Sequence, residues 1–347
     1  MVTNETIKSH HDLNVSIIVP VHNGGLNFRR CLSSLRDLDS NAIEIIVVAD
    51  GCNDDSPEAA AKAGVQVINL PESGGPARAR NKGALQAKGK YLFFIDADVA
   101  VPSNAVTQVE SAFQKDPELA AVIGSYDDSP DQINFLSQYK NLLHHYIHQM
   151  GHEEASTFWG ACGAIRRDIF FEMGGFDETY LKPSIEDIEL GYRLIQSGYQ
   201  IRLLKSIQVK HLKHWNVIQL LRSDVLDRAI PWTEVILRDR KFINDLNTGI
   251  KSRISVLLVY GFLVSLMAAI GWLDALFMAG VMGLLLMLIN FPIYRFFKRK
   301  HGLFFTLKAI LWHWFYYCYC GIGFTLGAIR YGWRRIKLFS KDRFSSS

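Results

Sequence analysis

A short acidic triplet, Asp96-Ala97-Asp98, follows the apolar run from Tyr91 to Ile95. Five aromatic and branched residues in a row are typical of a buried parallel strand. Both carboxylates are therefore expected at its carboxyl end, where open α/β sheets bind their ligands. Two acids at this spacing are able to share one divalent cation with a ribose or a pyrophosphate. An isolated Asp-x-Asp is more often a solvated turn, so the interpretation depends on the rest of the chain.

Polar residues also end the first and second predicted strands. Asn23 follows Pro20-Val21-His22, and Asp50 precedes Gly51. Because these strands lie side by side in such a sheet, Asn23 and Asp50 are expected to face one planar ligand such as a nucleobase. An Asp accepts from an imide N–H, as uracil offers. The alternative is that Asn23-Gly24 and Asp50-Gly51 are turn dipeptides alone.

The segment Gly74-Gly75-Pro76 precedes a predicted helix that carries Arg78, Arg80 and Asn81. Backbone N–H groups and the positive end of the helix dipole meet at such a start, and guanidinium groups add to the positive field. The segment therefore predicts an anion-binding loop, with the alternative that one arginine is a surface charge. Lys88-Gly89-Lys90 lacks the glycine pattern of a P-loop.

Two adjacent acids, Glu186 and Asp187, begin another predicted helix. Ser184, as N-cap, and Asp187 three residues later predict a capping box. A carboxylate fixed in a first helical turn is also suited to act as a general base. Farther along, His211 follows a predicted strand, and it is either a structural residue, a third metal ligand or a diphosphate contact.

The first part of the chain alternates short strands and helices. Alternation with short connections predicts an α/β fold with a doubly wound, mostly parallel sheet. The strands are expected at 15–21, 43–49, 65–70, 91–95 and 120–124, and the helices at 28–38, 56–63, 76–87 and 103–114.

Long apolar segments are concentrated near the end of the chain. Residues 254–273 carry no charge and 275–297 carry none before Arg295, so each is expected to cross a membrane. The sequence leaves open whether 303–329, interrupted by Lys308 and His313, spans, re-enters or lies in the interface. Apolar and basic residues interleave before these segments, which favours amphipathic interfacial helices interrupted at Pro231 over an ordinary surface helix pair.

Composition and charge restrict the class of protein further. The net charge of +4 over 347 residues is too small to indicate nucleic-acid binding. The five cysteines have no zinc spacing and are expected to be reduced thiols. No cleavable signal peptide is expected, and the basic cluster at 298–301 favours a multi-pass protein of the cell membrane whose polar part faces the cytoplasm.

Together these motifs resemble the family 2 glycosyltransferases, which have the A-type fold. The positions that carry the resemblance occur in the family's order between residues 15 and 215. They are Pro20 to Asn23, Asp50-Gly51, Gly75 to Gly83 with Arg80-Asn81, Asp96-Ala97-Asp98, Gly174-Gly175-Phe176-Asp177, and Glu186-Asp187 with Arg193.

The resemblance implies inverting transfer from a nucleotide-sugar, with a UDP-sugar favoured. By position, the nucleotide-sugar would be held by Pro20, Asn23, Asp50, Arg80, Asn81 and Asp96. Asp98 and Asp96, with His211, would hold Mg²⁺ or Mn²⁺. Asp187, beside Glu186, would take the proton from the acceptor. The segment His211-Leu212-Lys213-His214-Trp215 stands where processive polymerases of the family carry Gln-x-x-Arg-Trp, so processive polymerisation is not expected.

The expected acceptor is a hydroxyl of a lipid or of a lipid-linked glycan. Two other functions are a polyprenyl-phosphate glycosyltransferase, whose acceptor needs no base, and a catalytically silent membrane scaffold. A sugar-phosphate nucleotidylyltransferase is disfavoured because its glycine-rich, basic N-terminal signature is missing from this sequence. The predicted division is a polar tail at 1–14, a catalytic domain at 15–215, interfacial helices at 216–250, a membrane domain at 254–329 and a basic tail at 330–347.

Overall fold

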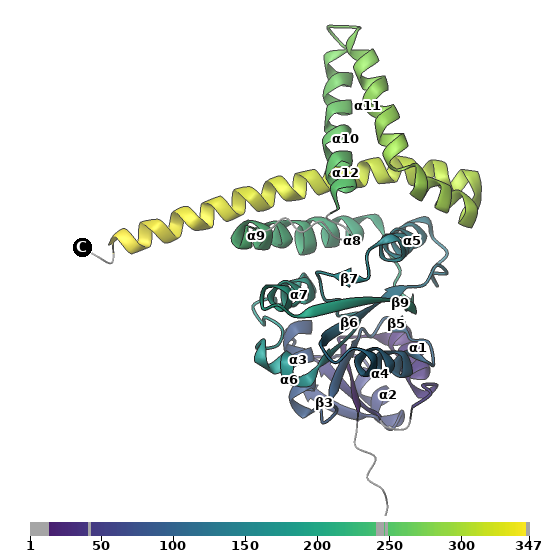
Figure 1. Ribbon diagram of the computed structural model, residues 1–347, viewed down its shortest axis with the longest axis vertical. Helices are drawn as coiled ribbons and strands as arrows, with labels where there is room; N and C mark the ends of the chain where they lie inside the picture. The colour runs from purple at the N-terminus through teal and green to yellow at the C-terminus, as the bar shows by residue number, and fades with distance from the viewer. Residues whose placement is uncertain (1–13, 41–42, 241–245, 247–248, 345–347) are drawn as a thin grey trace, which may run out of the picture. The chain divides into compact units, whose positions relative to one another are not determined.

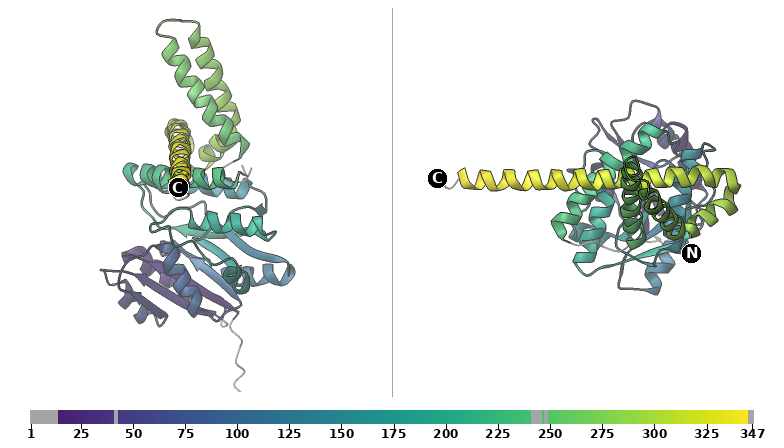
Figure 2. Two further views of the ribbon diagram at one scale, coloured as in Figure 1. Left: turned by 90° about the vertical axis from the view of Figure 1, so that its left-hand side faces the viewer. Right: turned by 90° about the horizontal axis from the view of Figure 1, so that it is seen from above.

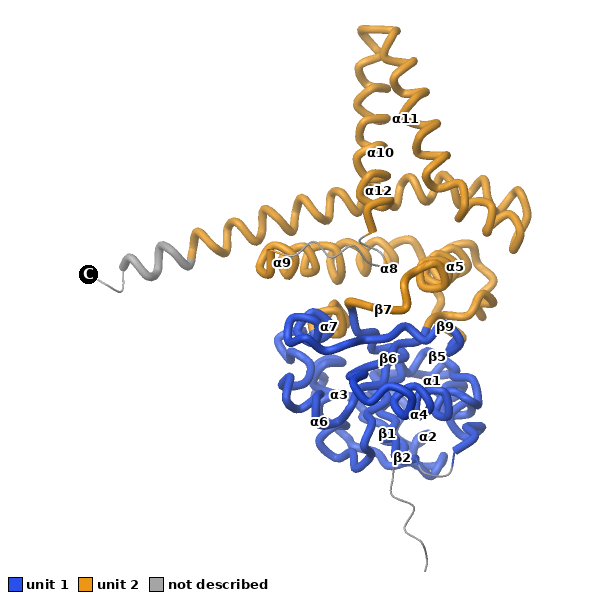
Figure 3. Tube along the Cα trace, in the orientation of Figure 1, with its two compact units in different colours: residues 1–124, 157–181, 190–209 blue, residues 125–156, 182–189, 210–347 orange. Residues whose placement is uncertain are grey.

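The computed structural model describes residues 14–40, 43–240, 246 and 249–344. The chain forms two compact units, coloured separately in Figure 3. Unit 1 comprises residues 1–124, 157–181 and 190–209, and unit 2 comprises 125–156, 182–189 and 210–347. Nearly all of the predicted tail at 1–14 lies outside the described residues. The division into functional domains stays a prediction.

Unit 1 contains most of the central sheet (Figure 1). Along the sheet the strands follow the order β3-β2-β1-β4-β8-β6-β9-β5. β1 pairs in parallel with β2 and β4, and β2 pairs in parallel with β3, whereas β8 is antiparallel to both β4 and β6. The predicted α/β class with a mostly parallel sheet is therefore confirmed. The strands are β1 Val15–Val21, β2 Ile43–Asp50, β3 Gln66–Leu70, β4 Tyr91–Ile95, β5 Val99–Ala100, β6 Leu119–Tyr126, β8 Cys162–Arg166 and β9 Gln200–His211.

Helices cover this sheet because their apolar side chains are buried against the apolar side chains of its strands. α3 packs on β1 and β2, and α2 packs on β2 and β3. Strands β1 and β4 have the predicted bounds, and the four helices predicted between these strands and after β4 are found with their ends shifted by three residues or fewer. The helices are α1 Gly25–Arg36, α2 Ser56–Lys62, α3 Pro76–Gln86, α4 Ala105–Lys115, α6 Arg167–Glu172 and α7 Glu186–Gln196, the last of which begins in unit 2 and ends in unit 1.

Unit 2 is mainly helical (Figures 1 and 2). α10 and α11 form an antiparallel hairpin, and α12 packs on α9 and on a π-helical turn, η1. The predicted interruption at Pro231 is wrong, because the chain stays helical through this residue and widens into η1 just before it. The elements are α5 Phe135–Met150, β7 Glu154–Ala155, α8 Val217–Arg222, η1 Ser223–Ala229, α9 Ile230–Asp239, α10 Ile250–Ala268, α11 Ala275–Ile289 and α12 Phe291–Phe344.

The expected single helix at 275–297 is instead broken at Asn290. α11 ends at Ile289, and Pro292 lies at the start of α12, where a ring without an N–H is tolerated. The buried Asn290 amide donates to Ser255 Oγ at 3.0 Å, and its carbonyl oxygen accepts from the Tyr317 hydroxyl at 2.8 Å. These contacts satisfy the polar groups at the break. A second break at Gly302, with φ +76°, separates 291–301 from the rest of α12.

Apolar side chains on α10 and α11 point largely to the outside of unit 2. Leu257, Met267 and Phe277 are 72%, 72% and 75% exposed. Among the described residues, two helical stretches are long and apolar enough to cross a membrane, Ile250–Ala268 and Ala275–Lys337. These stretches are candidate membrane anchors.

A buried carboxylate, Asp224, joins three helices of unit 2. Asp224 lies in η1 and is 6% exposed. One of its oxygens is 2.5 Å from Lys140 Nζ of α5, and the other accepts from the Tyr319 hydroxyl of α12 at 2.8 Å. Both carboxylate oxygens therefore have partners, as a buried charge requires.

We expect Asp224→Asn to lower the free energy of unfolding of the detergent-solubilised protein by about 3–5 kcal/mol, because it leaves the Lys140 charge without a buried partner. Chemical unfolding followed by tryptophan fluorescence measures this effect. The double variant Lys140→Met/Asp224→Leu should recover much of the loss, since it removes both charges. Unfolding of Asp224→Asn at the parent denaturant concentration would contradict the assignment.

Candidate functional site

Asp50, the last residue of β2, fixes the loop that precedes α3. Asp50 is 4% exposed. Its Oδ1 accepts from Gly74 N–H at 2.9 Å, and its Oδ2 accepts from Gly75 N–H at 2.9 Å and from Ser73 Oγ at 2.8 Å. Gly75 has φ +88°, and a Cβ there would lie 2.6 Å from the Leu181 carbonyl oxygen, so a larger residue does not fit. Asp50 thus uses its carboxylate to hold the Gly74-Gly75 loop.

The end of β1 lies beside the end of β2, as expected. In the parallel register Pro20 pairs with Val48 and Val21 with Ala49. Asn23 has φ +52°, a conformation that Asn adopts more readily than most residues. Its Oδ1 accepts from the Asn53 N–H at 2.7 Å. Pro20, Asn23 and Asp50 therefore occupy one edge of the sheet.

Arg80 and Asp96 form an ion pair at the same edge. Arg80 Nη2 lies 2.7 Å from Asp96 Oδ1, and their side chains are 5% and 34% exposed. The guanidinium carbon is also 5.4 Å from the centre of the Phe176 ring, within cation–π range. The pair orients the Asp96 carboxylate while leaving part of it open to solvent.

Asn81, next to Arg80, holds a second loop of unit 1. Its Nδ2 donates to the Phe176 carbonyl at 2.8 Å and to Glu178 Oε1 at 2.9 Å, and its Oδ1 accepts from Phe176 N–H at 2.9 Å. Arg193 Nη2 donates to the Gly175 carbonyl at 2.7 Å. The side chains of Asn81 and Arg193 thus fix the Gly174-Gly175 loop. The resemblance assigned Asn81 to the nucleotide-sugar, and that role stays a prediction.

The donor set of the acidic triplet fits a hard divalent cation. Asp96 and Asp98 follow β4 and supply only carboxylate oxygens, which Mg²⁺ and Mn²⁺ prefer. The nearby Cys31 Sγ points at the Asp96 carbonyl at 3.6 Å. Burial and the charges of Asp98 and Asp96 raise the pKa of this thiol far above its usual range, which favours its neutral form.

Within the described part of the chain, no three His, Cys, Asp or Glu side chains are placed to hold a metal together. A cation at Asp96 and Asp98 would therefore complete its coordination with water or ligand phosphate, as Mg²⁺ commonly does. His211 belongs to unit 2, where its ring stacks on Tyr126 at 4.3 Å. Its predicted role as a third metal ligand stays a prediction.

The start of α7 differs from the predicted capping box. The Ser184 N–H donates to Glu186 Oε2 at 2.9 Å, so the reciprocal carboxylate is Glu186 and not Asp187. The Ser184 hydroxyl donates instead to the Asp227 carbonyl at 2.5 Å. The capping-box prediction was therefore wrong. Asp187 lies in the first turn of α7, with Oδ1 accepting from the Ile188 N–H at 2.8 Å.

Pro231 lies four residues after Asp227, whose carbonyl accepts from the Ser184 hydroxyl. Proline has no N–H, so Pro231 cannot donate to the carbonyl four residues earlier, that of Asp227. The Ser184 hydroxyl supplies a donor from outside the helix. The start of α7 is thereby tied to the π-helical turn within unit 2. The sequence signal was available, since Pro231 in a helical pattern identifies Asp227 as the carbonyl to which it cannot donate.

Arg228, also in η1, was not predicted as a site residue. Desolvation acts to lower the pKa of its guanidinium, but Asp224, Asp187 and Glu186 raise that pKa above its usual value. The side chain is nevertheless exposed to solvent. Glu186, Asp187 and Arg228 thus form one electrostatic group in unit 2. π-Helical turns are often found at functional sites.

The structure thus divides the predicted site residues between the two units. Unit 1 brings together the residues at the carboxyl ends of β1, β2 and β4 and on α3, whereas unit 2 holds the acids of α7 and the histidine. The unit 1 residues are Pro20, Asn23, Asp50, Arg80, Asn81, Asp96 and Asp98, and the unit 2 residues are Glu186, Asp187 and His211.

Comparison with known families identifies similar proteins. The sequence model of glycosyl transferase family 2 matches residues 16–174, and that of the N-terminal domain of galactosyltransferase matches residues 142–215. A pre-mycofactocin glycosyltransferase of Mycobacterium tuberculosis (strain ATCC 25618 / H37Rv) is 31% identical over 214 residues, covering 58% of this chain and 43% of that protein.

A poly-beta-1,6-N-acetyl-D-glucosamine synthase of Staphylococcus aureus (strain COL) is 24% identical over 65% of this chain and 56% of its own length. The chain thus spans about half the length of these curated relatives. Among solved structures, the mannosyltransferase PcManGT from Pyrobaculum calidifontis, in complex with GDP-Man and Mn²⁺, has a TM-score of 0.57 at 17% identity. The match covers 90% of this chain and 87% of that one, which establishes a common fold.

We expect Asp50→Asn to lower the free energy of unfolding by about 1–3 kcal/mol, because an amide nitrogen would face the donors of the Gly74-Gly75 loop. The loop should also open more often, so trypsin should cleave faster after Arg78. Limited proteolysis followed by mass spectrometry measures both the site and the rate. Asp39→Asn, at an exposed position, is the control. Equal cleavage rates after Arg78 in both variants would contradict a loop-holding role for Asp50.

Proposed function

The chain is a family 2 glycosyltransferase, and from this premise we propose a membrane-anchored, inverting enzyme that uses a nucleotide-sugar donor. A UDP-sugar is the favoured donor, and the acceptor is a hydroxyl of a lipid or of a lipid-linked glycan. The observation that carries the proposal is the Arg80–Asp96 ion pair beside Asp98 at the carboxyl end of β4. Open α/β sheets bind their ligands at this end.

The donor is assigned to unit 1. Asn23 and Asp50, at the ends of β1 and β2, are proposed to face the nucleobase, with Pro20 beside them. The start of α3 offers backbone N–H groups to the diphosphate, and the Gly74-Gly75 loop that precedes it is held in place by Asp50. Asp96 and Asp98 would hold Mg²⁺ or Mn²⁺, which neutralises charge on the leaving diphosphate when bound. The Mn²⁺ complex of the mannosyltransferase with the same fold supports a divalent cation here.

Transfer then requires one proton acceptor. The acceptor oxygen forms a bond to the anomeric carbon, the bond from that carbon to the diphosphate oxygen breaks, and the hydroxyl proton passes to Asp187. Attack from the face opposite the leaving group inverts the configuration. Asp187 suits this role because it is fixed in the first turn of α7 and Glu186 is held by the Ser184 N–H beside it.

Membrane anchoring is assigned to α10 and α11 of unit 2. Their exposed apolar side chains would be covered by lipid, which avoids the free-energy cost of leaving them in water. We propose that the enzyme is a multi-pass protein of the cell membrane and that its catalytic unit faces the cytoplasm. The basic residues Lys298, Arg299 and Lys300, which follow these helices, support this orientation.

One observation favours a second candidate, a polyprenyl-phosphate glycosyltransferase. Arg228 is an exposed residue whose guanidinium belongs to the electrostatic group that contains Glu186 and Asp187. A guanidinium there would attract an anionic acceptor, and a phosphate oxygen needs no base. The hydroxyl acceptor therefore requires Asp187 as a general base, and the phosphate acceptor does not.

We expect Asp187→Asn to lower kcat by a factor of about 10²–10⁴ while leaving donor affinity unchanged, because it removes the general base alone. Release of nucleoside diphosphate in the presence of acceptor measures kcat, and donor-induced thermal stabilisation measures binding. Glu110→Gln on α4 is the matched control. Near-parent activity of Asp187→Asn would reject the hydroxyl acceptor in favour of the phosphate acceptor.

A further inference from the structure

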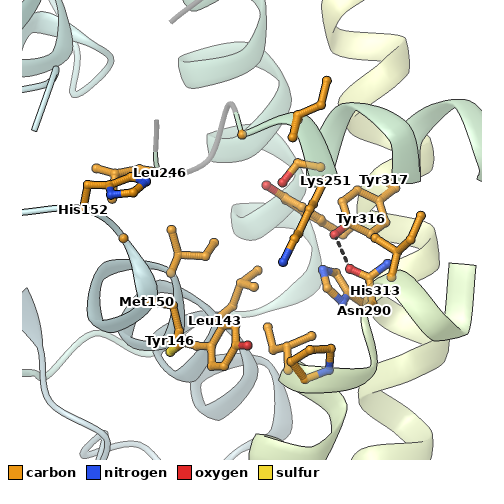
Figure 4. Close-up of a pocket in the computed structure, with 18 residues that line it drawn as sticks. Leu143, Tyr146, Met150, His152, Leu246, Lys251, Asn290, His313, Tyr316 and Tyr317 are labelled. Carbon is orange, nitrogen blue, oxygen red and sulfur yellow. Dashed lines mark hydrogen bonds between the residues drawn. The ribbon is translucent and has the colours of Figure 1, made fainter. Parts of the chain in front are cut away.

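Unit 2 contains a pocket of about 400 Å³ that is separate from the residues assigned to catalysis (Figure 4). Its walls come from α5, the start of α10, the junction of α11 and α12, and the middle of α12. Most of the wall is apolar, with Leu143, Met150 and Ile293 among its residues. This volume suits a small headgroup and a short length of hydrocarbon chain.

His313 lines the pocket and carries a polar atom without a partner among the described residues. Its side chain is 2% exposed, and its Nδ1 has no hydrogen-bond partner among the described residues. The ring is held in place by stacking on Tyr317 at 4.6 Å between ring centres. Tyr317 and Asn290, which also line the pocket, already bond to each other at 2.8 Å. A buried polar atom without a partner is costly, so a ligand that bonds to His313 would be stabilised.

Lys251 gives the same pocket a positive charge. It is exposed, and its side chain extends into the pocket on the side of His313 (Figure 4). None of the residues described as lining the pocket is an aspartate or a glutamate. The wall therefore combines one cation, one unsatisfied imidazole and an apolar surface. An anionic group attached to a hydrocarbon chain complements all three features.

The occupant follows from where the pocket lies in the fold. Ile250 and Lys251 are the first residues of α10, a candidate membrane helix whose apolar side chains are largely exposed. A lipid beside this helix has its phosphate near the helix end and its chain along the apolar face. We propose that this pocket binds a lipid phosphate, with the phosphate at Lys251 and His313 and the chain along the exposed apolar face of α10.

This inference rests on the proposed membrane anchoring and, where the bound lipid is the acceptor, on the proposed lipid acceptor. Such a lipid is either a polyprenyl phosphate acceptor, free or carrying a glycan, or a phospholipid of the surrounding membrane. Both have the same chemistry at the pocket. They differ in the chain and in the second substituent of the phosphate.

The test uses the full chain in phosphatidylcholine nanodiscs that also contain a polyprenyl phosphate, phosphatidic acid or neutral polyprenol. Retained lipid is measured by native mass spectrometry after gentle release. We expect the polyprenyl phosphate to be retained and polyprenol not. Lys251→Gln should lower retention about tenfold, since one charge-assisted bond to the phosphate is lost. His313→Phe, which keeps a ring of similar shape, should lower it as well.

Lys298→Gln is the control, because this exposed lysine does not line the pocket. Equal retention of phosphatidic acid would support the site and identify membrane phospholipid as its source, whereas selective retention of the polyprenyl phosphate identifies the acceptor. Equal retention of polyprenol, or no effect of Lys251→Gln, would overturn the proposal. Donor-induced thermal stabilisation of the same variants distinguishes this result from failure of the proposed function, since these changes lie outside the donor residues.

Discussion

The parallel pairing of β1 with β2 and β4 is the constraint on which the donor side of the molecule depends. Parallel strands in register end at one edge of a sheet, so residues distant in sequence arrive there together. The charges gathered at this edge would repel or be desolvated without partners. Each of these acids has partners in the structure. Arg80 pairs with Asp96, and three donors of the loop at 73–75 bond to Asp50. Positioning and electrostatic compensation are thus achieved by the same contacts.

Unit 2 also contains a buried carboxylate, Asp224, whose oxygens both have partners. Its π-helical turn buries Asp224 against Lys140 and Tyr319, and it exposes Arg228 near the acids that begin α7. The Ser184 hydroxyl donates to the Asp227 carbonyl of the same turn. The π-helical turn is therefore hydrogen-bonded to Ser184, shortly before the first turn of α7, which carries Asp187.

Sequence patterns predicted the strands and helices of unit 1 well, because alternation of buried strands with amphipathic helices has a strong signal. They also placed the candidate donor residues at strand ends. They failed where a polar group is satisfied by a distant residue: Asn290 divides the expected helix at 275–297, and the Ser184 hydroxyl bonds outside its own helix. The pocket around His313 was not predicted, because it depends on tertiary packing of four helices and not on local periodicity.

The central claim is that the carboxyl end of β4 binds a nucleotide-sugar with a divalent cation. Its most direct test is the thermal stabilisation of purified protein by UDP-, GDP- and dTDP-sugars with Mn²⁺, Mg²⁺ or EDTA, measured for the parent and for Asp98→Asn. We expect stabilisation by one nucleotide class, UDP first, that requires the metal and is lost in Asp98→Asn. Stabilisation that persists in EDTA or in Asp98→Asn would contradict the metal site, and no response to any donor would contradict the claim itself.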